Sequence, residues 1–433
     1  MISTLEVRQR LIGGGGTTPG KFRIVRRALV LVLLVTGAVG SYSATVYTGA
    51  TREIADRVGP LSTDATELYR SLADADATVA REFLSSGAEP ATIRTRYVEN
   101  IAGAEAILGR AAKQTGNDSV ATDRIADISA QLPTYTGLVE QARANNRQGL
   151  PVGVAYLRAV SNLMQSTILP AAEQLQRGQA KRLDKEYERA GTVPVLALLL
   201  CVTSLVGLVW AQVVLFRRTK RVFNVGLLAS TLAVFGALAW WIVASAYYHS
   251  YLENSQRHSQ SVTDALGPAQ IAALQARTNE SLTLVARDGG ATGEKNFSAQ
   301  AQHLARDDGA GGALGAARML ASDDEGRMLV ETALVETRVY LKAYEHVRQL
   351  DLDGRHTEAV AAAVGADAPS AAAFGKLDAA LGEAVKYERA QFIDDLTRAR
   401  SWLEGLLVGT ALLALAAVLG AVWGIGQRLK EYP

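Results

Sequence analysis

The stretch Ala28–Thr51, ALVLVLLVTGAVGSYSATVYTGAT, contains no Asp, Glu, Lys or Arg and is longer than the roughly 20 residues that a membrane-crossing helix needs. Three further stretches share both properties: 190–216, 222–252 and 405–427. After trimming, the sequence predicts four transmembrane helices, over 28–48, 194–216, 224–248 and 405–426.

The composition agrees with a membrane protein. Hydrophobic residues make up 48% of the 433 residues, but only 6% are aromatic. The net charge of +2 provides no strong field to attract nucleic acid, so a nucleic-acid partner is not expected. Because Cys201 is the single cysteine, an intramolecular disulfide framework and a cysteine-rich metal site are excluded.

The short flanking segments predict the orientation. Residues 1–27, the loop 217–223 and the tail 427–433 are each net positive, which is typical of cytoplasmic segments. We therefore expect a multi-pass protein of the cell (plasma) membrane with both termini in the cytoplasm. The long segments 49–193 and 249–404 would then be extracytoplasmic and would carry most of the mass.

A cleaved signal peptide is an alternative interpretation of residues 28–44, since a basic leader precedes them and small residues end them. The apolar run continues to Thr48, however, and a heptad pattern follows it directly, which favours a retained helix. Cleavage would leave three transmembrane helices and the same external segments.

Both external segments are predicted to be helical. Apolar residues recur in alternating steps of four and three from the end of the first transmembrane helix, which is a heptad pattern: Ile54, Val58, Leu61, Ala65, Leu68, Leu72, Ala75 and Val79. Gly59-Pro60 interrupts this pattern and could kink the helix. Helix-capping signals occur at 116–119 and 322–325, and the glycine-rich stretch 309–315 is expected to be a loop.

Short sequence matches relate the two external segments to each other. Gly59-Pro60 matches Gly267-Pro268, and Tyr187-Glu188-Arg189-Ala190 matches Tyr387-Glu388-Arg389-Ala390. Similar offsets between matching segments indicate a probable internal duplication. The expected fold class is therefore an all-α integral membrane protein with two extracytoplasmic four-helix-bundle, sensor-like domains.

No motif for catalysis or cofactor binding stands out. Residues 15–21 fit most of a phosphate-binding loop, but Phe22 occupies the position that needs Ser or Thr, and a transmembrane helix follows, so a flexible tether is favoured. The five histidines form no zinc-binding pattern, and neither a nucleophile elbow nor a kinase signature occurs. We predict no enzyme activity, no cofactor and no metal site.

Two groups of residues are candidates for partner or ligand contacts. The basic residues Arg217, Arg218, Lys220 and Arg221 form the only loop between predicted spans on the cytoplasmic side, where a partner could dock. Tyr187, Arg189, Tyr387 and Arg389 could line an external site, with arginine binding a carboxylate. A solvated helix surface is the ordinary interpretation of the second group, and it applies equally to Arg70, Arg81, Arg277 and Arg287.

The fourth predicted transmembrane helix carries two GxxxG spacings, Gly405–Gly409 and Gly420–Gly424. Such spacings permit two helices to approach closely, within one chain or between chains. Because no predicted span has an ionisable residue at mid-depth, ion or proton transport is disfavoured.

The architecture resembles that of actinobacterial GlnX-type membrane proteins. The resemblance covers the whole chain: four spans, two external helical segments, the basic loop 217–221 and no output domain among the predicted cytoplasmic segments. It rests on no catalytic motif, so it assigns no functional residues. It implies a relay in which a GlnH-type lipoprotein senses external aspartate or glutamate and a PknG-type serine/threonine kinase responds in the cytoplasm.

The sequence leaves three hypotheses open: this non-enzymatic relay, a direct sensor of a small ligand, and a structural membrane scaffold. In either of the first two, external helices that continue into transmembrane helices could transmit a displacement across the membrane. The ligand, the binding face and the oligomeric state do not follow from the sequence.

Overall fold

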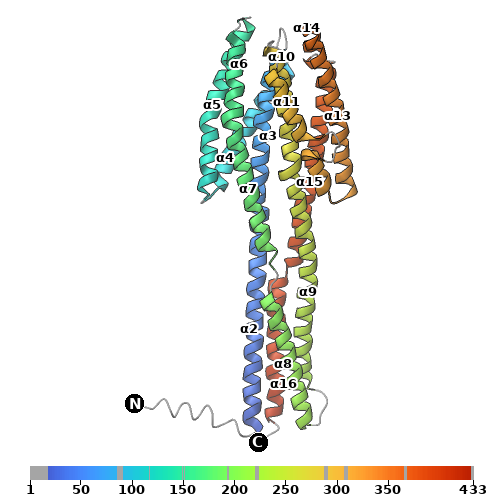
Figure 1. Ribbon diagram of the computed structural model, residues 1–433. Helices are drawn as coiled ribbons and strands as arrows, with labels where there is room; N and C mark the ends of the chain where they lie inside the picture. The colour runs from blue at the N-terminus through green and yellow to red at the C-terminus, as the bar shows by residue number, and fades with distance from the viewer. Residues whose placement is uncertain are drawn as a thin grey trace, which may run out of the picture. The chain divides into compact units, whose positions relative to one another are not determined.

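The computed structural model describes residues 18–84, 91–116, 118–148, 150, 152–192, 195–219, 224–286, 291–306, 311–364 and 368–430 (Figure 1). Every regular element among these residues is a helix, and none of them lies in a strand. The prediction of an all-α protein is therefore confirmed over the described part of the chain.

The chain divides into two compact units, which we describe separately. The span unit comprises Met1–Arg52, Glu188–Leu252 and Leu396–Pro433, and the bundle unit comprises Glu53–Tyr187 and Glu253–Asp395. Four helices among the described residues are long and apolar enough to cross a membrane. Their number agrees with the four predicted spans, whereas the predicted orientation stays a prediction.

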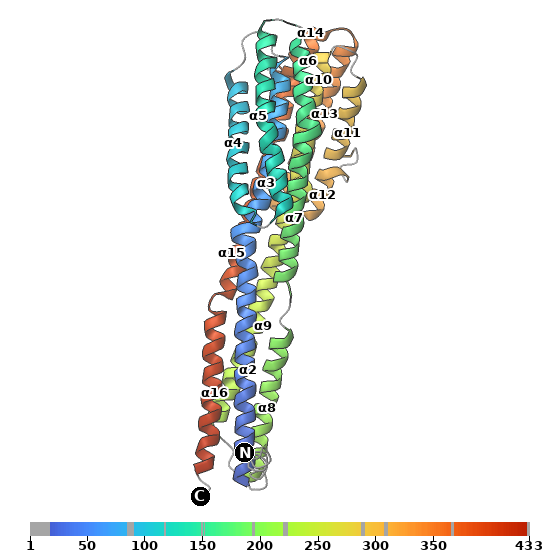
Figure 2. The same ribbon diagram turned by 90° about the vertical axis from the view of Figure 1, so that its left-hand side faces the viewer.

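The span unit contains α2 (Thr18–Glu53), α8 (Val195–Thr219), α9 (Val225–Gln260) and α16 (Leu406–Lys430), which lie side by side over their apolar stretches (Figures 1 and 2). Its small core is built from buried aliphatic side chains of all four helices. Many large apolar side chains of these helices remain exposed. An exposed apolar surface of this extent suits contact with lipid.

The bundle unit consists of two halves with a similar order of elements. The first half contains α3 (Gly59–Glu82), α4 (Ala91–Gln114), α5 (Ser119–Arg147), α6 (Val152–Leu163) and α7 (Leu169–Ala190). The second half contains α10 (Gly267–Ala286), α11 (Ala291–Leu304), α12 (Gly312–Leu320), α13 (Asp324–Leu352), α14 (His356–Val364) and α15 (Pro369–Leu403). In the first half α3 packs on α4 and α5 on α6, and in the second α10 packs on α11 and α13 on α14.

The two halves share one hydrophobic core, which differs from the prediction of two separate bundles. The core cluster contains buried residues from both halves, and α3 packs directly on α10. These two helices are rich in alanine at buried positions, for example Ala73, Ala77, Ala272 and Ala276. Small side chains allow close packing on several sides, and every residue from Ser71 to Ala80 is buried. A search for a single apolar stripe does not identify such a central helix, because the helix is buried on all sides.

The heptad pattern itself is confirmed by burial. Seven of its eight positions are buried, and only Val58 is intermediate. The predicted helix starts are also confirmed. Asp118 caps α5 by accepting a hydrogen bond from the Ala121 amide at 3.2 Å, and Asp323 caps α13 by accepting one from the Gly326 amide at 2.7 Å.

The prediction of a loop over 309–315 was wrong for its second part, because α12 begins at Gly312. Gly312 has φ +75°, a conformation that suits glycine. In the helix that begins here, Leu314 and Ala317 are buried in the core. The equal 29-residue lengths of α5 and α13 are in keeping with a duplication, which stays a prediction.

Three prolines inside long helical runs are each preceded by a π-helical segment. These are η1 (Ile54–Val58) before Pro60, η2 (Met164–Ile168) before Pro170 and η3 (Ser261–Leu266) before Pro268. Proline has no N–H to donate and would break a helix, so one wider turn lets the helix continue past it. At each site the residue before proline donates its N–H to the carbonyl five residues back.

As a result, α2, η1 and α3 follow one another without a non-helical residue, and so do α9, η3 and α10. The predicted interruption at Gly59-Pro60 is therefore present as a change of helical register, and the helix does not end there. The same device occurs at η2, between α6 and α7.

Candidate functional site

The predicted docking loop lies largely outside the described residues. Arg217 belongs to the last turn of α8 and is exposed. The backbone of Arg218 is also helical, whereas Lys220 and Arg221 are not among the described residues. The docking role of these four residues stays a prediction.

The two predicted external tyrosines contact neighbouring helices. Tyr187 is buried, and its hydroxyl lies 2.7 Å from the Ser255 hydroxyl. The hydroxyl of Tyr387 donates a hydrogen bond of 2.5 Å to Asp323, the N-cap of α13. Both side chains therefore support packing in the bundle unit, and Tyr187 does not present its ring to solvent.

The two predicted arginines lie in different surroundings. Arg189, in the last turn of α7, is exposed. Arg389 of α15 reaches α3 of the other half, where one guanidinium nitrogen lies 3.5 Å from a Glu67 carboxylate oxygen. Burial lowers the pKa of the Arg389 guanidinium. Arg389 thus contacts a carboxylate, as the motif suggested, but the carboxylate belongs to the protein itself.

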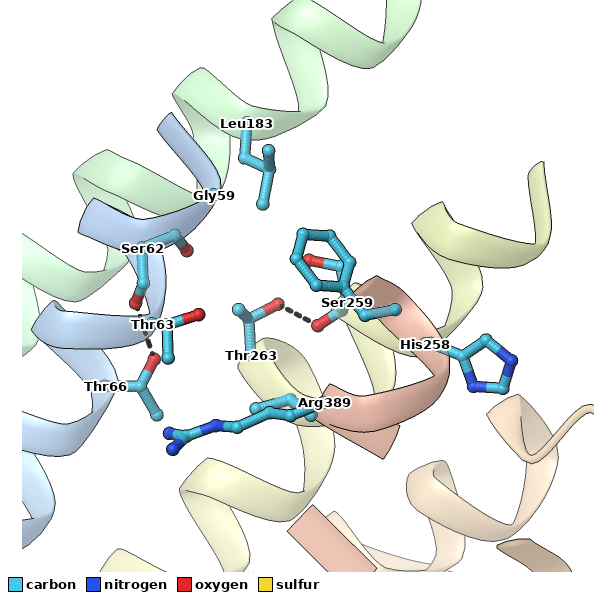
Figure 3. A pocket seen from close by; sticks show the side chains of 11 residues that line it. Gly59, Ser62, Thr63, Thr66, Leu183, His258, Ser259, Thr263 and Arg389 are labelled. Atoms are coloured by element: carbon cyan, nitrogen blue, oxygen red, sulfur yellow. Dashed lines mark hydrogen bonds between the residues drawn. The ribbon is translucent and has the colours of Figure 1, made fainter. Parts of the chain in front are cut away.

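Arg389 also lines a small cavity of about 20 Å³ between α3, η3, α7 and α15. Figure 3 shows its side chain extending across the cavity toward the helix that carries Thr66. A cavity of this size accommodates about one water molecule. It is too small for an organic ligand. The role of Arg189 and Arg389 in contacts with a ligand or partner stays a prediction.

The second GxxxG spacing lies at the contact between α9 and α16. A Cβ atom added to Gly226 would lie 2.5 Å from the Gly420 carbonyl oxygen and 2.6 Å from the Gly424 Cα. The first spacing differs, because Gly405 has φ +78° and precedes α16, while Gly409 faces the Trp240 ring. Gly420 and Gly424 thus pack within the chain.

We expect Gly226→Ala to destabilise the span unit by about 1–3 kcal/mol, because the added methyl group overlaps the backbone of α16. The matched control is Gly236→Ala on the same helix, where an added Cβ meets no atom within 4 Å. Thermal unfolding of both variants in detergent measures the difference. Equal midpoints for the two variants would contradict a packing role for this contact.

A buried histidine at the end of α9 contacts α15 and the connection between α12 and α13. The Nδ1 of His258 lies 2.5 Å from Glu388, and its Nε2 lies 3.7 Å from Asp395 and 3.3 Å from the Ser322 hydroxyl. Burial lowers the pKa of His258, but the hydrogen bond and charge of Glu388, with Asp395 and Asp323, outweigh it, so the pKa is raised. The raised pKa favours the imidazolium form, and in that form His258 and Glu388 make an ion pair between the end of α9 and α15.

The second half also contains a buried ion pair that is fully hydrogen-bonded on its acidic side. Arg277 donates to Glu280 at 2.6 Å, and the hydroxyls of Tyr340 and Ser370 donate to the same carboxylate at 3.0 and 2.6 Å. Arg277 also donates to the Ala363 carbonyl at 2.6 Å. These contacts join α10 to α13, α14 and α15.

The first half contains a buried carboxyl group of a different kind. Asp76 is 2% exposed and accepts hydrogen bonds from Ser161 at 3.0 Å and Gln165 at 3.3 Å. No cationic side chain forms an ion pair with it among the described residues. Burial raises the pKa of Asp76 to about 7, although the two hydrogen bonds oppose the rise. Sequence analysis did not single out Asp76, although it lies four residues after Leu72 and three before Val79 of the heptad pattern.

A cleft of about 700 Å³ lies between the two halves of the bundle unit. One wall comes from η2 and α7 of the first half, and the other from η3, α10, α11 and α12 of the second. Pro170 and Pro268 both line it, and Gln165 connects it to Asp76. Of the residues noted in the sequence, Pro268 of the Gly267-Pro268 match lines this cleft.

No group of His, Cys, Asp or Glu among the described residues has the arrangement of a metal site. The cleft is large enough for a small organic molecule, since ligand pockets typically measure about 300–1,000 Å³. Its polar lining offers hydrogen bonds and charges to such a molecule, which makes the cleft a candidate binding site.

Comparison with known proteins bears on the first half of the bundle unit. Residues 50–188 match the family described as Actinobacterial sensor domain. No curated protein and no solved structure shows a significant match to the chain. The match covers about a third of the chain and supports an actinobacterial sensor protein, and the apolar helices make its association with a membrane plausible.

Proposed function

We propose that the chain is a non-enzymatic transmembrane signal relay. In this proposal the bundle unit lies outside the plasma membrane, both termini lie in the cytoplasm, and the four apolar helices connect the two sides. The observation that carries the proposal is the unbroken helical run from α2 through η1 into α3, with its counterpart from α9 through η3 into α10. A continuous helix can transmit a shift or a rotation, whereas a flexible linker cannot.

The partners in this proposal follow from the resemblance to GlnX-type proteins. An extracytoplasmic amino-acid-binding lipoprotein that senses aspartate or glutamate would supply the input, and a cytoplasmic serine/threonine kinase would receive the output. The match of residues 50–188 to a sensor domain supports a sensing role for the bundle unit. The basic segment at Arg217 and Arg218 offers a docking point for the kinase.

The relay is tested in cells that contain the chain, the lipoprotein and the kinase. Deletion of the chain is expected to abolish the response of the kinase to external aspartate or glutamate while leaving the kinase itself intact. An unchanged response would instead support the structural scaffold. Protease protection of intact cells checks the orientation, because a cytosolic location of the bundle unit would refute the proposal.

A direct sensor of a small ligand is the second candidate, and the 700 Å³ cleft favours it. The two candidates differ in what binds the purified protein. The relay requires the lipoprotein to bind, whereas the direct sensor binds a solute without it. Calorimetric titration of the full-length protein against the solute and then the lipoprotein distinguishes them.

We expect replacement of Arg217, Arg218, Lys220 and Arg221 by glutamine to reduce kinase output at least tenfold, since a docking partner would lose four positive charges. The same change could invert the topology, because these charges also orient the spans. Cysteine-accessibility labelling therefore accompanies the measurement, and replacement of Lys181 and Lys185 on α7 is the matched control for loss of charge. Normal orientation together with normal output would contradict a docking role.

A further inference from the structure

The cleft between the halves is lined by an unusual number of amide side chains. Five glutamines from four elements border it: Gln165, Gln176, Gln275, Gln300 and Gln302. Each amide offers both a donor and an acceptor to a ligand. The apolar part of the lining consists of small and cyclic side chains, among them Pro170, Pro268 and Ala316. Such a lining suits a compact polar molecule.

One wall of the cleft carries an exposed carboxylate group, that of Asp264. Asp264 of η3 forms no ion pair among the described residues. Burial raises the pKa of Asp264, and the nearby carboxylate of Asp184 raises it further. A positively charged group placed here would relieve both effects. Glu173 on α7 is the second carboxylate of the lining, and it is paired at 2.5 Å with the exposed Arg177, which also lines the cleft.

The opposite wall carries basic groups. His303 lies in the last turn of α11, and Arg306 follows that helix; both line the cleft and are exposed. Neither forms an ion pair with a carboxylate among the described residues. The cleft therefore has a carboxylate without an ion pair on η3, an ion pair on α7 and a basic side at the end of α11.

The walls are held together by a specific contact near Asp264. The Gly267 N–H donates to the Val262 carbonyl, and Pro268 has no N–H for the next carbonyl, that of Thr263. The side chain of Gln176 donates to this carbonyl at 3.0 Å from α7 of the other half. The π-helical turn thus leaves the Thr263 carbonyl free to accept the bond from Gln176 that joins the two walls. Such turns are frequent at functional sites.

We propose that this cleft binds a small zwitterionic solute, with its ammonium group beside Asp264 and its carboxylate beside Arg306. The proposal rests on the direct-sensor candidate above and specifies the ligand class. A simple anion or cation would leave one side of the cleft uncompensated, and an apolar molecule would leave the amides without partners. Free amino acids and short peptides share the required pair of end groups, and the volume admits either.

The test uses the full-length protein in nanodiscs and two probes, glycine and triglycine, in calorimetric titrations without lipoprotein. Blocked forms of each probe, N-acetylated or amidated, remove one charge at a time. We expect at least one zwitterion to bind and its blocked forms to bind at least tenfold more weakly. Binding of glycine alone assigns free amino acids, and binding of triglycine alone or of both assigns peptides to the site as well.

Variants locate the binding to the cleft. Asp264→Asn and Arg306→Gln are each expected to weaken binding at least tenfold, and Ala316→Trp to abolish it by filling the space. Asp353→Asn and Arg355→Gln, in the turn between α13 and α14, are the matched controls and keep wild-type affinity. Unfolding midpoints equal to that of the wild type show that each variant is folded.

Absence of binding at millimolar concentration, equal binding of blocked and unblocked probes, or wild-type affinity in the Asp264 and Arg306 variants would each overturn the proposal. Lipoprotein binding is measured on the same preparations. If it persists when no zwitterion binds, the relay survives and only the cleft assignment fails. If zwitterions bind but the lipoprotein does not, the relay in its present form fails and the cleft assignment stands.

Discussion

Replacing Glu280 by glutamine is expected to destabilise the bundle unit by about 3–5 kcal/mol, because the change leaves the buried Arg277 guanidinium without its counter-charge. The side chains of Arg277 and Glu280 are only 2% and 1% exposed, so water cannot compensate for the missing carboxylate. The hydroxyls of Tyr340 and Ser370 donate to different oxygens of Glu280, so the single amide oxygen of glutamine can keep one of these two bonds in place. Most of the expected loss of stability therefore comes from the unpaired charge of Arg277.

Hydrogen exchange of α10 and α15 amides in the full-length protein measures this effect. The double variant Glu280→Gln with Arg277→Met is expected to recover most of the loss, because it removes the unpaired charge as well. Glu358→Gln is the surface control, since Glu358 pairs with Arg355 in solvent, and it should leave exchange unchanged. A single variant as stable as the wild type would show that Arg277 finds another partner or that water enters the core.

Replacing Glu280 lowers stability, whereas replacing Asp76 by asparagine is expected to raise the stability of the protein above neutral pH. The folded protein raises the pKa of Asp76 to about 7, whereas an aspartate in an unfolded chain titrates near 3.9. The folded state thus binds more protons than the unfolded state between these values. The contribution of Asp76 to stability is consequently highest below about pH 4 and falls as the pH rises to about 7, by about 4 kcal/mol in total.

Asparagine at position 76 cannot ionise, so this dependence on pH should disappear in the variant. At pH 8 Asp76→Asn is expected to be more stable than the wild type, by up to about 4 kcal/mol less the cost of rearranging the bonds to Ser161 and Gln165. Exchange of α3 amides between pH 4 and pH 8 provides the measurement. A wild-type slope in the variant would mean that another group titrates.

Asp74 provides the matched control for Asp76 on the same helix. It is also buried, but it accepts hydrogen bonds from Arg96 at 2.9 Å and Asn100 at 2.8 Å. Asp74→Asn should therefore destabilise the protein, because Arg96 loses a charge partner. Both carboxyl groups are buried, but only Asp74 has a cationic partner. If Asp74→Asn destabilises the protein and Asp76→Asn stabilises it at pH 8, the difference is due to the cation and not to burial.

The parts of the fold that depend on composition and period were predictable from the sequence. The four apolar helices follow from stretches without charge, and the heptad pattern beginning at Ile54 identified the buried face of α3. The N-caps Asp118 and Asp323 also follow from local chemistry, because a short acidic side chain at a helix start satisfies free backbone amides. These features are encoded within a few neighbouring residues.

Features that depend on contacts between the halves were not predictable. Asp74 and Asp76 look like a solvated face until α10 covers the helix that carries them, since a single amphipathic pattern cannot describe a helix buried on all sides. Tyr187 looked available for a ligand but is buried by its contact with Ser255. The cleft also needs both halves, because its walls lie about 100 residues apart in the sequence.

The wider turns before Pro60, Pro170 and Pro268 have a mechanical consequence. A π-bulge contains one surplus residue, and it can migrate along a helix as successive peptide groups exchange acceptors, without the helix melting. Each displaced residue turns the helix beyond it by about 100°. Proline blocks such migration in the C-terminal direction, because it has no hydrogen to hand on. In η1 and η3 the direction that proline leaves open is toward α2 and α9, so a shift of either wider turn would run that way along the helix.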